Sequence, residues 1–115
     1  MAKVKAATKP RTTAKMETVP RKAVGVDSDI KTTNLARLRR IEGQVRGVQK
    51  MVEDDRYCAD ILHQIAAAQE ALRAVGRELI RNHLKHCSTQ AIRAGGDEAA
   101  AMYDELVELF DRNYR

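Results

Sequence analysis

Cysteine and histidine are the residues of this sequence with the clearest capacity for chemistry. His83 and Cys87 form an H-x-x-x-C pair, and Cys58 is the other cysteine. On an α-helix a spacing of four residues places two side chains on the same side, one turn apart. Two thiolates and one imidazole make a soft ligand set of low coordination number, which suits Cu(I) or, with an added ligand, Zn(II). Cys58, His83 and Cys87 are therefore the predicted metal ligands.

Helices are the elements predicted to position these ligands. Apolar residues recur at steps of three and four from about Asn34 to Asp54, which predicts a first helix with Thr32 or Thr33 as its N-cap. The segment contains no alternating strand pattern. A second helical pattern starts at Tyr57 and carries all three candidate ligands.

The second helix is predicted to run without interruption to about Ala94. Gly95 and Gly96 end it, and a third, short amphipathic helix follows, with Asp97 as its N-cap and apolar residues through Phe110. The sequence therefore predicts an all-α fold with three helices per protomer.

The length of the second helix bears on how the ligands meet. At about 100° per residue, His83 and Cys87 project within roughly 20° of Cys58, on the apolar side of the helix. At 1.5 Å per residue, however, the two cysteines lie about 43 Å apart, too far to share a metal. Two antiparallel copies bring Cys58 of one beside His83 and Cys87 of the other, with Gln69 facing Gly76 near the two-fold axis. The simpler alternative is that the cysteines are small buried apolar residues and His83 a core histidine.

The charge of the chain is uneven. The net charge is +5 with a pI of about 9.5, and residues 1–30 hold seven basic against three acidic residues and both prolines, whereas residues 95–115 hold two basic and six acidic. We interpret residues 1–30 as a disordered basic tail and residues 31–115 as the folded domain. Only four residues are aromatic and none is Trp, which argues against base-stacking RNA or single-strand binders.

The first helix carries the candidate DNA-binding residues. On a helical projection Arg37, Arg40 and Lys50 point away from the apolar stripe, and Arg39 and Arg46 flank it. Together with the tail they make one end of the molecule cationic, as in nucleic-acid-binding proteins. The alternative is an ordinary solvated face. No helix-turn-helix or zinc-finger spacing is present, so we expect contact through a positive surface on an oligomer.

Several other classes of protein are disfavoured by the sequence. There is no apolar run of about 18 residues and no apolar core of a secretory signal, so we expect a cytoplasmic protein without membrane contact, whose thiols stay reduced. No acid–base pair or activated nucleophile is visible, so we expect no enzymatic activity.

Two stretches resemble a known family. The run RLRRIEGQVRGVQKMVEDDRYCADILHQIAAAQEAL and the later NHLKHC are similar to the CsoR/RcnR family of bacterial metal-sensing transcriptional repressors, over about residues 34–110. The resemblance implies an antiparallel four-helix-bundle dimer and a disc-shaped tetramer formed by two dimers. It also implies binding to operator DNA in the empty state and release when the effector binds. Residues 31–115 would then be the DNA-binding and metal-sensing domain.

The resemblance also assigns roles to residues. In the copper-sensing branch Cys, His and Cys hold Cu(I) across the protomer boundary, and these positions fall on Cys58, His83 and Cys87. A supporting Tyr and Glu fall on Tyr57 and Glu105. The segment before Glu105 is about two residues longer than in copper sensors, so Tyr103 or Asp104 are alternatives at that position.

The other branches of the family match less well. The nickel and cobalt branch uses a histidine near the N-terminus, whereas residues 1–57 contain none. The persulfide branch lacks the histidine that is present here at position 83. Two alternative functions remain: a thiol or persulfide sensor that links Cys58 to Cys87 between subunits, and a metal store without DNA binding.

Overall fold

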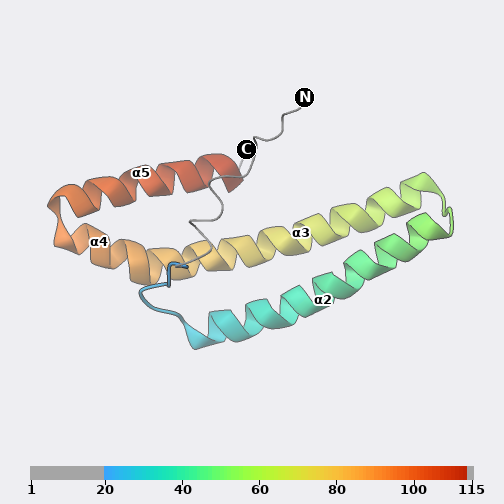
Figure 1. Cartoon of the computed structure of the whole chain (residues 1–115), viewed down its shortest axis with the longest axis horizontal. Coiled ribbons are helices and arrows are strands. Elements are labelled where there is room, and N and C mark those ends of the chain that lie inside the picture. The colour runs from blue at the N-terminus through green and yellow to red at the C-terminus, as the bar shows by residue number, and fades with distance from the viewer. Residues whose placement is uncertain (1–19, 114–115) are drawn as a thin grey trace, which may run out of the picture.

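The computed structural model describes residues 20–113 of the chain, and these form three helical rods (Figure 1). The first rod is α2, the second is α3 continued by η2 and α4, and the third is α5. In chain order the elements are α2 (Ser28–Glu53), α3 (Cys58–Asn82), the π-helical turn η2 (His83–Ser88), α4 (Thr89–Ala94) and α5 (Gly96–Asn113). The predicted all-α class and the three helices are confirmed for this part of the chain.

Helix α2 begins earlier than the sequence pattern predicts. Asp27 is its N-cap, and one carboxylate oxygen accepts the backbone N–H of Asp29 at 3.0 Å and of Ile30 at 3.2 Å. The predicted start at Asn34, capped by Thr32 or Thr33, is therefore wrong, because an aspartate satisfies the free N–H groups two turns upstream. Residues 28–30 of the predicted tail are helical, and residues 1–19 lie outside the described residues.

A short turn joins α2 to α3 as an antiparallel hairpin (Figure 1). Asp55 takes a positive φ of 53°, and Arg56 N–H donates to the Met51 carbonyl at 3.0 Å. Between the two helices lies a buried seam. Its buried residues are Asn34 and Ile41 from α2 and Ala68, Val75 and Asn82 from α3.

One position beyond the seam, each helix carries a second apolar stripe that the chain leaves exposed. On α2 this stripe contains Leu35, Leu38, Val45 and Val52, and on α3 it contains Leu62, Leu72 and Leu79. The residue that follows a seam position lies about 100° further around its helix. In an antiparallel pair, this step leads to the same side of the pair on both helices. The two stripes therefore form one continuous apolar surface, which we call the outer face. The single apolar stripe predicted for the second helix is in fact two, one covered and one not.

Helix α5 folds back along the second rod, on the side away from α2 (Figure 1). Gly95 and Gly96 make the turn with φ of 75° and 56°, a region that glycine enters without steric cost. The Gly95 carbonyl accepts the Ala99 N–H at 3.2 Å, and Asp97 lies in the first turn of α5. The expected cap at Asp97 is therefore wrong, since the glycine turn starts the helix at Gly96, two residues earlier than a cap at Asp97 would. Within residues 20–113, no helix combines the length and apolarity needed to cross a membrane.

Candidate metal centre

The H-x-x-x-C motif coincides with the π-helical turn of the long rod. The turn spans His83–Ser88, and both His83 and Cys87 are half-buried. Thr89 donates its hydroxyl to the Leu84 carbonyl at 2.7 Å, which gives that backbone oxygen a partner beside the widened turn. π-Helical turns are rare and often occur at functional sites. The turn keeps the imidazole and the thiol on one side of the rod.

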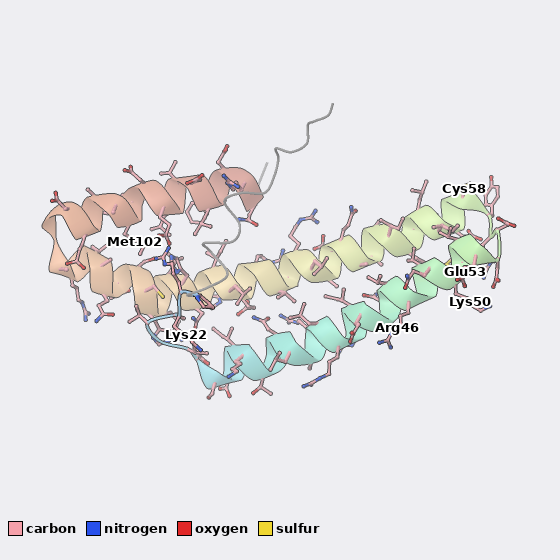
Figure 2. All side chains as sticks on the ribbon, viewed as in Figure 1. Lys22, Arg46, Lys50, Glu53, Cys58 and Met102 are labelled. Carbon is pink, nitrogen blue, oxygen red and sulfur yellow. The ribbon has the colours of Figure 1, made fainter. Side chains whose placement is uncertain are left out.

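His83 and Cys87 line a cavity of about 710 Å³ between the second rod and α5. Leu79 contributes to its wall from α3, and Met102 and Glu105 contribute from α5. The buried Ser88 hydroxyl donates to Met102 Sδ at 3.4 Å, which ties α5 to the π-turn. Figure 2 shows Met102 directed from α5 toward the second rod. The cavity therefore has soft donor atoms on one wall and a carboxylate on the opposite wall.

Glu105 is the α5 residue that reaches His83. Its Oε2 atom lies 2.8 Å from His83 Nε2, and both side chains are partly shielded from solvent. Tyr103 and Asp104, the alternatives at this position, are exposed. Because Nε2 faces the carboxylate, Nδ1 is the ring nitrogen left for a metal. A carboxylate beside a metal-binding histidine commonly orients the ring; here His83 Nε2 makes the close contact without the geometry of a hydrogen bond.

Cys58 lies at the opposite end of α3 from this cavity (Figure 2). It is exposed at the first position of the helix, and Tyr57 beside it is 75% exposed. In the described part of the chain, no three His, Cys, Asp or Glu side chains come together as a metal site. One chain therefore places His83 against Glu105 and puts Cys87 in the wall of the same cavity, but it leaves Cys58 and Tyr57 at the other end of α3.

The outer face extends from Cys58 at one end of α3 to His83 at the other. Alternating steps of four and three residues run from Cys58 to His83 along one side of α3, through Leu62, Ile65, Gln69, Leu72, Gly76 and Leu79. Leu62, Leu72 and Leu79 are 62%, 48% and 56% exposed. A regular seven-residue repeat of this kind is the pattern by which helices pack against helices. The candidate ligands thus mark both ends of an uncovered packing stripe.

Four of the five candidate DNA-binding residues are exposed on α2: Arg39, Arg40, Arg46 and Lys50. Arg37 differs from the prediction, because it is half-buried at a seam position between Asn34 and Ile41. An arginine can occupy such a position by burying its aliphatic stem while its guanidinium stays in water.

Two of these cations have acidic neighbours on their own helix. Arg46 lies 3.7 Å from Glu42, and Lys50 lies 3.1 Å from Asp54. Exposed pairs four residues apart contribute only about 0.3–0.5 kcal/mol each. Both side chains can therefore exchange their carboxylate for a phosphate at little cost.

The sequence analysis missed residues 20–27, which pack against the π-turn. Arg21, Lys22, Ala23 and Val24 line the same cavity as His83 and Cys87. Their composition indicated only a basic tail, and no periodic pattern marks them. The one local signal was Asp27, a good N-cap residue ahead of Ile30, which would have moved the helix start and drawn this segment into the fold.

A small all-helical protein with an imidazole and thiols at the ends of an uncovered helical stripe is a candidate binder of a soft metal. Comparison with known proteins identifies its family. Residues 30–112 match the family described as metal-sensitive transcriptional repressor, and the chain belongs to this family.

Named relatives fall in the copper-sensing part of this family. The chain is 51% identical over 76 residues to the copper-sensing transcriptional repressor CsoR of Bacillus subtilis. This match covers 66% of this chain and 73% of the relative. It is 54% identical over 63 residues to the copper-sensing transcriptional repressor RicR of Mycobacterium tuberculosis, which covers 55% of this chain and 66% of the relative.

A solved structure is similar over nearly the whole chain. It is a crystal structure of the copper-sensing repressor CsoR with Cu(I) from Geobacillus thermodenitrificans, 42% identical, with a TM-score of 0.65. The match covers 94% of this chain and 95% of that one.

Proposed function

We propose that this protein is a copper(I)-responsive transcriptional repressor, which binds operator double-stranded DNA when empty and releases it when Cu(I) binds. The observation that carries the proposal is the arrangement of the ligands along the rod formed by α3 and η2. His83 and Cys87 line one cavity, while Cys58 lies at the far end of the same uncovered stripe. The relatives that are named copper sensors support the choice of metal and of response.

The residues present fit a cuprous ion. Thiolates are soft ligands that favour Cu(I), and His83 has Nδ1 free because Nε2 faces Glu105 at 2.8 Å. The proposed ligands are His83 and Cys87 of one subunit and Cys58 of a second subunit, and the ion supplies a link between the two chains. Zn(II) would need a fourth ligand to complete a tetrahedron.

The second subunit is proposed to lie antiparallel on the outer face. Pairing two outer faces covers the exposed leucines of α3 and brings each Cys58 to the other chain's His83 and Cys87. A Cβ atom at Gly76 would meet nothing within 4 Å in the single chain, which leaves room there for the other subunit's Gln69. Two such dimers would make the tetramer that the family resemblance implies.

The basic residues of α2 are proposed to contact the DNA backbone. Arg39, Arg40, Arg46 and Lys50 present their charges to solvent on one helix, and the half-buried Arg37 lies beside them. Phosphate contacts of this kind give strong, salt-dependent binding without reading bases. In a shared-ligand site, Cu(I) restrains two subunits relative to each other, and a coupling of about 1–3 kcal/mol changes DNA affinity roughly 5- to 150-fold. We place this switch in the cytoplasm, where thiols remain reduced.

Fluorescence anisotropy with the DNA upstream of the protein's own gene tests the proposal. Empty protein should bind the fragment, and one Cu(I) per subunit should release it. A Cys58→Ser variant should bind DNA and ignore Cu(I). Release by a polysulfide, which transfers sulfane sulfur to a thiolate, would instead indicate persulfide sensing if it persists in His83→Ala. Tight Cu(I) binding without any DNA binding would indicate a metal store.

A further inference from the structure

Residues 20–27 form a strap that is fastened to the metal-binding end of the long rod. Asn82, at the last position of α3, is 8% exposed and uses both ends of its side-chain amide. Its Nδ2 donates to the Gly25 carbonyl at 3.0 Å, and its Oδ1 accepts the Asp27 N–H at 2.8 Å. A buried amide that satisfies two backbone groups of another segment holds that segment in one position.

Two further contacts fasten the same strap. Lys85 Nζ donates to Asp27 Oδ2 at 3.0 Å, while the other oxygen of that carboxylate caps α2. This Lys85 contact and the backbone N–H donors lower the pKa of Asp27. Gly25 packs so closely on His86 that a Cβ atom there would lie 2.9 Å from Nδ1. All the fastening residues of the rod fall at positions 82–86, immediately before and within the motif that carries His83 and Cys87.

The strap is also a wall of the metal cavity. Arg21 and Lys22 line it together with His83 and Cys87, and Glu98 and Glu105 line it from α5. Two thiolates and one cuprous ion carry a net single negative charge, because a metal-binding cysteine must be deprotonated. Cations in the wall of a partly enclosed cavity stabilise that charge more strongly than they would in open water. Arg21 and Lys22 thus line the metal cavity and belong to the basic N-terminal part of the sequence.

We propose that residues 20–27 act as a latched strap, positioned by Asn82, that closes the metal cavity and couples its occupancy to the basic N-terminal segment. A movement of the π-turn on metal binding shifts the strap because the two are fastened at three points. The loaded cavity and DNA phosphates then compete for Arg21 and Lys22. The coupling part rests on the proposed copper response, whereas the closure part concerns the protein alone.

The first experiment uses the full-length protein without metal. Asn82→Ala removes the bridging amide, and Gly25→Ala forces the strap away from His86 while it leaves all the hydrogen-bonding groups in place. Asn113→Ala is the matched control, since its amide donates to the Leu109 carbonyl of its own helix. Backbone hydrogen exchange over residues 20–27 and the rate of Cys87 alkylation should both rise about ten-fold in the two test variants and not in the control. If Gly25→Ala is folded by circular dichroism and its exchange and alkylation rates equal those of the parent, the proposal that residues 20–27 close the cavity is refuted.

The second experiment measures coupling. Replacing Arg21 and Lys22 together by glutamine should weaken Cu(I) binding roughly three- to ten-fold in competition with a cuprous chelator. The charge-matched control replaces Arg77 and Arg81 together by glutamine, since both are exposed on α3 and neither lines the cavity. Asn82→Ala should reduce the change in DNA affinity caused by Cu(I). If the strap opens in the first experiment but Cu(I) and DNA remain coupled as in the parent, the link is refuted. If the parent itself does not respond to Cu(I), the proposed function fails, while the exchange rates still decide whether the strap exists.

Discussion

The replacement of Leu72 by alanine is the most informative perturbation of the proposed assembly. Leu72 lies near the middle of the outer face, next to Gly76, where a two-fold axis would bring two copies of it close together. The side chain is 48% exposed in the single chain, so its own chain covers about half of it. Antiparallel pairing would have to cover the rest.

The expected loss of dimer stability follows from the fraction of Leu72 that its own chain leaves exposed. Truncation of a fully buried leucine to alanine costs about 2–5 kcal/mol. About half of the Leu72 surface is left for the second subunit to cover, so the share lost from the interface is roughly 1–2 kcal/mol per copy. The axis doubles this to roughly 2–4 kcal/mol for the dimer, which weakens association about 30- to 1,000-fold.

Sedimentation equilibrium of the metal-free protein over a range of concentrations measures this effect. Leu72→Ala should shift the equilibrium toward monomer, and Cu(I) affinity should fall with it at low protein concentration, because each site needs two chains. Val107→Ala is a control on α5, where the side chain is exposed outside the outer face. The interpretation is refuted if the variant associates like the parent, or if a monomer binds one cuprous ion through both sulfurs.

Four other predictions concern single residues. His83→Ala should keep Cu(I) binding through the cysteines but lose most of the copper-induced DNA release in anisotropy titrations; full release would refute the role given to the imidazole. Arg40→Ala should weaken DNA binding and reduce the slope of log affinity against log salt by about 1, and an unchanged slope would remove it from the contact surface. The Lys85 ammonium holds the pKa of Asp27 below its ordinary value, so its carboxylate stabilises the fold at neutral pH and this contribution is lost as pH falls through the lowered pKa. The difference in urea midpoint between Asp27→Asn and the parent should therefore be present at pH 7 and disappear in strong acid, and a constant difference would contradict this. Gly95→Ala should destabilise the protein by about 1 kcal/mol or more in urea unfolding because φ is 75°, and no loss would show that the turn adapts.

The local pattern of apolar residues was sufficient to predict the helices, because their spacing follows the helical period of 3.6 residues. The same periodicity places Cys58, His83 and Cys87 on one side of the long helix, and the distance along that helix predicts that a second chain completes the site. Helix ends were less predictable. Asp27 and Gly95 start their helices through cap and turn geometry that competes with equally plausible residues nearby.

Only the tertiary structure shows which apolar stripe is buried and which is exposed. Periodicity cannot distinguish the covered seam at Ile41 and Val75 from the uncovered outer face at Leu72, since adjacent stripes on a helix have the same repeat. It also could not place Arg37 at the seam. Only the packing of α2 on α3 separates these faces.

By itself, the sequence determined the helical fold class, and it predicts a soft ligand set and a second subunit, because these inferences depend on residue type and on rise and rotation per residue. Only the tertiary structure decided that Glu105 rather than Tyr103 meets His83, and that residues 20–27 wall the cavity beside Cys87. These contacts join segments 22 and about 60 residues apart in the chain. Such contacts depend on the angle of the glycine turn and on a few specific hydrogen bonds, which no local periodicity records.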